Sequence, residues 1–174
     1  MEAAVKTKWN LDTTHSEIAF KVKHMMISTV TGFFEDFNAS VETENEDFRN
    51  GEFRFSAKID AINTKNKDRD AHLKSDDFFN AQAYPEMTFV SKSFDGETLV
   101  GDLTIRGVTK EVSLDANFNG VAIDPYGQTK AGFEISGIID RKDFGLSWSA
   151  VTDAGSIVVA DKVKLAAELQ FVKQ

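Results

Sequence analysis

Apolar and polar residues alternate position by position over most of this 174-residue chain. A two-residue period is typical of β-strands that turn one face toward a core and the other toward water. Residues 52–60 and 163–171 show it most clearly, because every second residue there is apolar. From runs of this kind we predict eight strands, at residues 15–24, 30–42, 51–61, 86–94, 97–106, 109–120, 128–140 and 157–172.

Residues suited to tight turns separate these runs. Asp95 and Gly96 favour a two-residue hairpin, because both accept a positive φ angle at low cost. Gly107 marks a second reversal, and the Asp-Pro-Tyr-Gly run at 124–127 marks a third. Eight antiparallel strands, several with one apolar face, predict an all-β closed barrel whose interior can hold one small ligand. A two-sheet sandwich remains the alternative, because periodicity alone does not distinguish the two.

The interval between the third and fourth predicted strands has a different pattern. Residues 65–73 contain neither Gly nor Pro, and Thr64 is a suitable N-cap, so we predict a short helix there. Ser75 is suited to cap a further turn. The expected fold is therefore an eight-stranded antiparallel barrel with one short helical insertion near residues 64–80.

The length of the chain suits one domain with a substantial core. We assign this domain to residues 9–172 and expect residues 1–8 to form a flexible terminal segment. The first residues are polar and lack the apolar segment of a secretory signal. No run approaches the roughly 20 apolar residues that cross a bilayer. As written, the chain is expected in the cytoplasm, or in the periplasm if a signal has been removed.

The charge balance argues against nucleic-acid binding. Twenty basic residues stand against 28 acidic ones, for a net charge of −8. Along the sequence, no group of Lys and Arg is dense enough to neutralise a phosphate backbone. The same deficit argues against electrostatic docking on anionic membranes and against stable membrane insertion.

No metal site is expected. The chain has no cysteine, which excludes disulfides, zinc–thiolate sites and thiol catalysis. Its three histidines, His15, His24 and His72, are not spaced as a metal-binding pair on one helix face. We interpret them as structural and predict no cofactor.

Phenylalanine is unusually frequent, with 15 copies against two Trp and two Tyr. Ordinary core filling explains any single one of them. Together, however, stiff apolar rings on the inward positions of a barrel favour a dry interior for a long apolar molecule. The residues that we predict to line the ligand site are Phe20, Val22, Phe37, Phe53, Phe55, Phe89, Leu103, Phe118, Phe133 and Leu165.

A polar group on the predicted helix is the candidate for one mouth of the barrel. Arg69, Asp70 and His72, with His24, are positioned to contact a ligand head group, and Arg69 is able to donate a bidentate pair of hydrogen bonds. The alternative is that Arg69 and Asp70 brace the helix across the barrel end. In both interpretations, Asp102 and the Arg-Lys-Asp run at 141–143 are the expected partners.

Signatures of catalysis are absent from the sequence. There is no Gly-x-Ser-x-Gly elbow, and the adjacency of His15 and Ser16 does not make a triad. Phosphate-binding glycine loops are missing, and the acidic pair Asp76-Asp77 has the character of a solvated turn. We therefore predict that the protein is not an enzyme and has no catalytic residues.

Four motifs follow one another along nearly the whole chain. They are Asp-x-x-His-Ser-x-Ile-x-Phe at 12–20, Lys-Asp-Arg-Asp-Ala-His-Leu at 67–73 with Tyr-Pro-Glu-Met-Thr-Phe at 84–89, Gly-Asp-Leu-Thr-Ile-Arg-Gly-Val-Thr-Lys at 101–110, and Arg-x-Asp-Phe-Gly at 141–145. In order and spacing the chain resembles the YceI-like family of lipocalin-type polyisoprenoid-binding proteins from bacteria, from about Trp9 to Phe171.

This resemblance implies a lipocalin-like barrel that binds, stores or transports a long isoprenoid lipid of the polyprenyl or quinone type without covalent chemistry. The lipid is then the expected partner, and a homodimer stays open. Two alternatives stay open as well. One is an enzyme that acts on an isoprenoid or quinone in the same pocket, and the other is a stress-response protein with a filled barrel.

Overall fold

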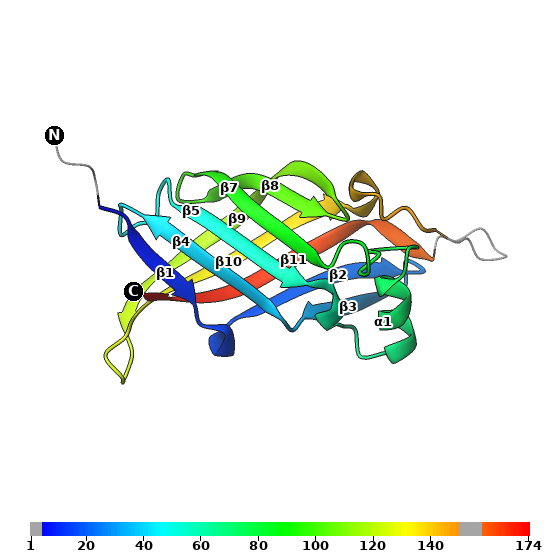
Figure 1. The fold of residues 1–174 in the computed structure, drawn as a ribbon, viewed down its shortest axis with the longest axis horizontal. Helices are drawn as coiled ribbons and strands as arrows, with labels where there is room; N and C mark the ends of the chain where they lie inside the picture. Colours follow the sequence, from blue (N-terminus) through cyan, green and yellow to red (C-terminus); the bar gives the residue numbers. More distant parts are fainter. Residues whose placement is uncertain (1–4, 150–157) are drawn as a thin grey trace.

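One antiparallel sheet closes on itself to form the body of the protein (Figure 1). The structure is a computed structural model and describes residues 5–149 and 158–174. The strands are β1 (Thr7–Leu11), β2 (Glu17–His24), β3 (Ser28–Phe34), β4 (Phe37–Thr43), β5 (Glu52–Lys58), β6 (Ile62–Asn63), β7 (Glu86–Phe94), β8 (Thr98–Ile105), β9 (Val108–Ile123), β10 (Thr129–Asp140) and β11 (Val159–Lys173). The one α-helix among these residues is α1 (Lys67–Lys74), with short 3-10 turns at η1 (Thr13–His15), η2 (Ile59–Ala61) and η3 (Arg141–Phe144).

Closure of the sheet depends on two bent strands. β11 pairs with β10 along one edge, and with both β1 and β2 along the other. β4 in turn pairs with β1, and β3 pairs with β2. β1 and β2 therefore act as one barrel strand that bends at η1, and β3 and β4 act as another that bends at residues 35–36. Counted in this way, the barrel has eight antiparallel strands, and the predicted all-β barrel with one short helix is confirmed.

Three local predictions need correction. The run 30–42 is not one regular strand, because β3 and β4 pair with different neighbours on either side of the bend. β1 begins at Thr7, inside the terminal segment that we expected to be flexible. The N-cap of α1 is Asn66, whose side chain accepts from the backbone N–H of Arg69, and Thr64 has another role described below.

The three predicted turns are found where the sequence places them. The Asp95 carboxylate accepts from the N–H groups of Glu97 and Thr98, which fixes the β7–β8 hairpin around Gly96. Asp124 does the same for the β9–β10 turn, where its carboxylate accepts from two backbone N–H groups. At the β8–β9 turn, Gly107 has a φ of 72°, and an added Cβ would meet the ring of Tyr84 at 2.8 Å.

The inward positions follow the predicted alternation. Phe53 is buried, and Phe55, Val163 and Leu165 are partly buried against the same core. A one-residue slip of these strands would turn all four side chains to water, so the apolar face fixes the register. α1 lies at one end of the barrel, beside the turn between β2 and β3, and the start of β1 and the end of β11 lie at the other end (Figure 1).

Candidate ligand-binding site

The middle of the barrel encloses an apolar cavity of about 110 Å³. Phe53 and Phe55 of β5 line one side of it, Phe89 of β7 and Leu103 of β8 the next, and Leu165 of β11 lies across from them. These side chains come from strands far apart in the sequence and meet only because the sheet closes. The cavity therefore suits a group that is itself apolar.

Two further apolar cavities continue from the central one toward α1. The next, of about 80 Å³, shares Phe34, Met87 and Leu165 with the central cavity. The outermost, of about 180 Å³, shares a further set of side chains with the second, Phe20 and Phe78 among them. The three cavities thus follow one another from the middle of the barrel to its mouth, separated by side chains and not by backbone.

The ten predicted lining residues do not all lie along this path. Seven of them line one or more of the three cavities, namely Phe20, Val22, Phe53, Phe55, Phe89, Leu103 and Leu165. Phe37 is half-buried and lines a groove at the outside of the barrel, beside the bend between β3 and β4. Phe118 and Phe133 lie deeper, at the end of the barrel away from α1.

That second end is filled by aromatic rings in direct contact. Phe133 is 1% exposed and its ring centre lies between 5.1 and 6.3 Å from those of five other phenylalanines. Phe48, which comes from the loop between β4 and β5, enters this cluster with a φ of 64° and no exposed surface. Its ring packs against the rings of Trp9, Phe118 and Phe133. The full ring cluster consists of Trp9, Phe48, Phe53, Phe94, Phe118, Phe133 and Phe171.

The outermost cavity is lined by three of the four predicted mouth residues, His24, Arg69 and His72. The fourth, Asp70, does not line it. The ring of His72 stands edge-on to those of Phe78 and Trp148, at 5.1 and 5.0 Å between ring centres. Its Nε2 lies 2.8 Å from the Asp77 carboxylate, which orients the ring. The mouth therefore combines aromatic walls with a few polar groups.

Arg69 and Asp70 both form hydrogen bonds with Thr64, which is 2% exposed. Arg69 donates from Nε to Thr64 Oγ1 at 2.8 Å and from Nη2 to the Thr64 carbonyl at 2.5 Å. Asp70 accepts from the Thr64 N–H at 2.9 Å and from its hydroxyl. Every polar atom of a buried threonine is satisfied in this way, as burial requires. The geometry favours the brace over the head-group clamp for these two residues.

Two further arginines hold the rest of the mouth, namely Arg141, which we expected as a partner of the mouth network, and Arg106, which we did not predict. Arg141 is 4% exposed and donates to the carbonyl groups of Leu146, Trp148, Val159 and Ala160. Burial lowers the pKa of its guanidinium. This one side chain therefore joins the segment that carries Trp148 to the start of β11.

Arg106 has the corresponding role on the other side of the mouth. It donates to the carbonyl groups of Asp76 and Phe78 and pairs with the Asp76 carboxylate at 2.7 Å. Arg106 belongs to the motif at 101–110, and Arg141 belongs to the motif at 141–145. The motifs therefore pointed to these two residues, but both arginines hold loops in place by hydrogen bonds to backbone carbonyl groups. Asp102, an expected partner of the mouth network, instead lies on the outer face of β8 and pairs with Lys92 at 3.4 Å.

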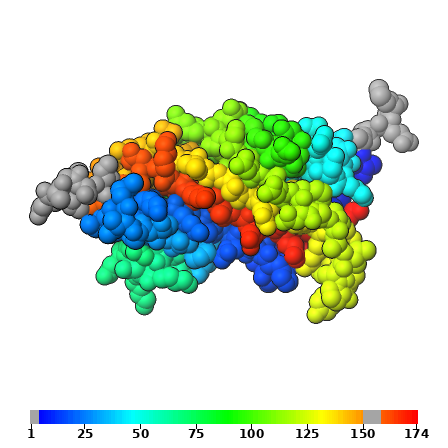
Figure 2. Space-filling view, turned by 180° about the vertical axis from the view of Figure 1, so that it is seen from behind, coloured from blue at the N-terminus to red at the C-terminus, as the bar shows by residue number. Residues whose placement is uncertain are grey.

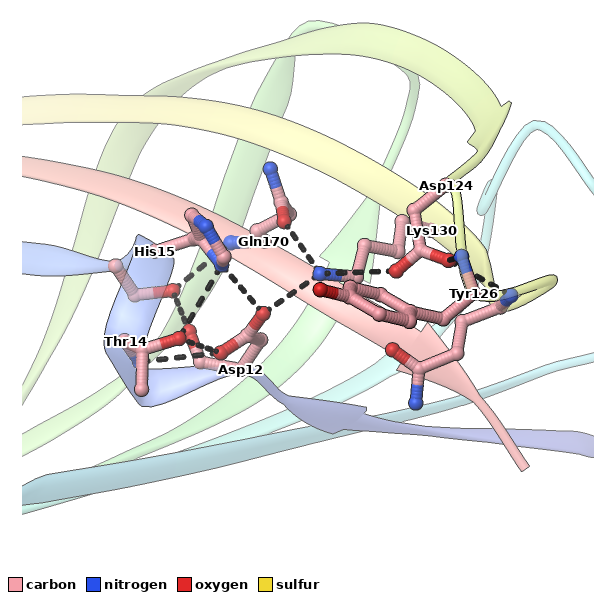
Figure 3. Close-up of polar contacts among 9 residues, drawn as sticks. Asp12, Thr14, His15, Asp124, Tyr126, Lys130 and Gln170 are labelled. Carbon is pink, nitrogen blue, oxygen red and sulfur yellow. Dashed lines mark hydrogen bonds and ion pairs between the residues drawn. The ribbon is translucent and has the colours of Figure 1, made fainter.

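A separate polar cluster lies outside the barrel, where β1 turns into β2 (Figure 3). Lys130 Nζ lies 2.7 Å from Asp12 Oδ2, 3.1 Å from Gln170 Oε1 and 3.5 Å from Asp124 Oδ2. The Lys130 ammonium, with further hydrogen bonds from Thr14 and His15, holds the pKa of Asp12 well below its usual range. The same contact to Asp12 raises the pKa of Lys130. This cluster fastens the η1 bend across β11 and braces the closure of the barrel.

In residues 5–149 and 158–174, no group of three or more His, Asp or Glu side chains is arranged to hold a metal ion. Of the helices in these ranges, none has the length and apolar character to cross a membrane.

The fold and its interior define a small closed β-barrel with an apolar path from its centre to one mouth. The chain matches the YceI-like domain over residues 9–171 and belongs to that family. A UPF0312 protein of Staphylococcus epidermidis is 39% identical over 166 residues, which cover 95% of this chain and 97% of that protein.

Solved structures show the same architecture. The YCEI protein of Campylobacter jejuni is 36% identical and matches with a TM-score of 0.72 over 100% of this chain and 99% of that one. A polyisoprenoid binding domain from Saccharophagus degradans, implicated in plant cell wall breakdown, is 16% identical. It matches with a TM-score of 0.74 over 95% of this chain and 98% of its own, and at that identity the likeness concerns the fold alone.

Proposed function

We propose that this protein binds a long apolar molecule of the isoprenoid class inside its barrel, without changing it chemically. The observation that carries the proposal is the series of three apolar cavities that runs from the mouth at α1 to the centre of the barrel. The polyisoprenoid binding domain with the same fold supports the choice of ligand class. Such a protein would store, shield or carry the lipid through water.

An elongated ligand requires the walls between the cavities to move. Each cavity is smaller than the roughly 300–1,000 Å³ of an ordinary small-molecule site. The side chains shared by the two inner cavities are Phe34, Met87 and Leu165. Met87 is unbranched and changes rotamer easily, and Leu165 is only partly buried. Rotation of these side chains would join the cavities, and apolar burial of about 25 cal/mol per Å² would offset its cost.

The lining argues for binding without catalysis. Among the residues that the structure describes, no histidine or carboxylate lines the two inner cavities. The polar groups lie at the mouth, where Asp77 holds His72 and Thr64 holds Arg69. A ligand whose apolar chain enters the barrel would therefore keep its head group at the mouth, beside His24 and His72.

The test places a bulky side chain in the central cavity. Ala167 of β11 lines this cavity, whereas Ala122 of β9 is exposed and lines none of the three cavities. Ala167→Phe should abolish binding of a polyprenol or a long-tailed quinone in calorimetric titrations, while Ala122→Phe should leave binding unchanged. Circular dichroism checks that both variants stay folded. Unchanged binding by a folded Ala167→Phe variant would refute the proposal.

A further inference from the structure

Four lysines gather on the outer face of the barrel, near the α1 end. β2 presents Lys21 and Lys23 to solvent, and β11 presents Lys162 and Lys164. These two strands are neighbours, and their register places Lys21 directly opposite Lys164. Figure 2 shows the face that they share, where β2 and β3 (blue) lie against β11 (orange to red). We call these four residues the lysine patch.

The lysine patch bears on our inference from the net charge, which argued against electrostatic docking on anionic membranes. Its two halves lie near opposite ends of a sequence with a net charge of −8, and only the pairing of β2 with β11 unites them. Like charges directly opposite each other on a sheet are unfavourable. Lys162 has a partial partner in Asp140 at 3.4 Å. In residues 5–149 and 158–174, no carboxylate forms an ion pair with Lys21, Lys23 or Lys164.

The charge changes sign along this same face. Toward the other end of the barrel, Glu134 of β10, Glu168 of β11 and Glu17 of β2 form a row across three strands. The row between the glutamates and the lysines consists of Ser136, Ala166 and Ala19, which carry no charge. An extended anionic surface would therefore attract the α1 end of this face and repel the other end.

The β2–β3 turn beside the lysine patch exposes apolar side chains. Met26 is 64% exposed and Ile27 is 82% exposed. Three residues, 25–27, connect the paired residues His24 and Ser28, and Met25 and Met26 among them have φ angles of 51° and 59°, in the left-handed range that favours Asn and Gly. Methionine is uncommon at such angles, and a strained conformation of this kind points to a use for the side chain. Met26 and Ile27 form what we call the apolar tip.

We propose that the lysine patch and the apolar tip together dock the mouth of the barrel onto an anionic lipid surface. Lysines held near such a surface are attracted to its head groups, and apolar side chains enter the boundary between head groups and acyl chains. The acidic remainder of the protein would be repelled, so contact is confined to one orientation. Lys23 also lines the outermost cavity, which places the docked face beside the mouth.

The first test uses vesicles without any isoprenoid. The protein should sediment with phosphatidylcholine vesicles that contain about one-third phosphatidylglycerol, and not with pure phosphatidylcholine vesicles. About 0.5 M salt should release it, because screening weakens charge attraction. Each lysine near the surface contributes about fivefold to binding, so Lys21→Gln with Lys164→Gln should weaken it about 25-fold.

The matched control removes two charges elsewhere. Lys8 of β1 and Lys58 of β5 lie on strands outside the patch, and Lys58 has only an exposed contact of 3.6 Å to Glu86. Lys8→Gln with Lys58→Gln should therefore leave vesicle binding nearly unchanged. An equal loss in both double variants would overturn the proposal, because net charge alone would then explain the attraction.

The second test separates the apolar tip from the stability of the fold. Met26→Gly with Ile27→Thr relieves the strained turn, so the melting temperature should stay the same or rise while vesicle binding falls several-fold. Unchanged binding would exclude the tip from the docking surface.

Two further outcomes would overturn the proposal as a whole. One is the absence of sedimentation with the anionic vesicles. The other is lysine-dependent binding to soluble polyglutamate without vesicle binding, which would assign the patch to an acidic protein. The purpose that we assign to docking, lipid exchange, rests on the function proposed above. Binding of the isoprenoid ligand is therefore measured separately by titration. Vesicle binding without isoprenoid binding would refute that function and leave the docking intact.

Discussion

The two ends of this barrel are built differently. At the end near the chain termini, seven aromatic side chains pack ring against ring around Phe133. At the α1 end, the apolar side chains leave cavities between them, and charged side chains such as Arg141 hold the loops in place. The comparison teaches that one family fold separates its tasks along the barrel axis. The filled end stabilises the barrel, and the braced end keeps cavities that would admit the ligand proposed above.

The largest effect should come from removing the centre of the filled end. Phe133→Ala should lower the free energy of unfolding by about 3–5 kcal/mol, because the lost ring leaves a cavity among five partners. Denaturant unfolding measures the loss. Ligand affinity of the fraction that remains folded should not change.

Phe34→Ala is the corresponding change at the other end. The ring of Phe34 packs against two others, those of Phe20 and Phe79, and it already borders two cavities. We expect a smaller loss of stability than for Phe133→Ala, together with tighter binding of a long apolar ligand as the cavities join. Equal stability losses and equal affinities in the two variants would mean that the ends do not differ in function.

The next effect concerns the brace at the mouth. Arg141→Lys keeps the charge but loses the fork that reaches four carbonyl groups, so the unfolding free energy should fall by about 2–3 kcal/mol. Trp148 should become more exposed, which tryptophan fluorescence quenching detects. If quenching shows the same exposure of Trp148 in the variant as in the wild type, Arg141 does not hold the mouth.

Arg69→Ala distinguishes brace from head-group clamp. Because Arg69 binds Thr64, we expect a loss of about 1–3 kcal/mol in stability and equal, small changes in affinity for a quinone-headed isoprenoid and a headless hydrocarbon of the same length. Calorimetry compares the two ligands. A selective loss for the headed ligand in a stably folded variant would restore the clamp.

The smallest effect is expected outside the barrel, at the Asp12–Lys130 cluster. Asp12→Asn should cost about 1–2 kcal/mol near neutral pH, since the pair is mostly but not fully buried. The folded state lowers the pKa of Asp12, so its contribution is present above about pH 4 and lost as the pH falls further. The difference in stability between wild type and variant should therefore shrink below about pH 4. A constant difference would exclude the ion pair as its cause.

Alternation in the sequence was enough to predict the strands and their inward faces, because every inward position must be apolar for the sheet to close around a core. The choice of a barrel over a two-sheet sandwich needed the pairing of β11 with β1 and β2. We did not predict the bend at residues 35–36, although the adjacent polar residues Glu35 and Asp36 interrupt the alternation there. Nor does periodicity give the height of a side chain along the barrel axis. Phe55 and Phe133 both pack into the interior, yet Phe55 lines the central cavity and Phe133 lies inside the ring cluster.

The mouth was harder to predict for another reason. Arg69 and Asp70 were recognised from their motif, but their shared partner, Thr64, was assigned the wrong role because a helix cap is a local inference. Arg106 and Arg141 act on backbone carbonyl groups, which no sequence pattern distinguishes from one another. The lysine patch needs the register of β2 against β11, and that register exists only in the folded chain.

The pairing of β1 with β11 has a consequence for how the protein is made. Trp9 is the register partner of Lys173, so the seam of the barrel joins the two ends of the chain. A growing chain on the ribosome therefore cannot close until β11 has been synthesised, and such distant pairings fold slowly. Until then β1, β2 and β10 each lack the neighbour that β11 supplies, and their open edges are able to pair with other chains. Slow synthesis at low temperature should accordingly raise the soluble yield more than any single stabilising substitution.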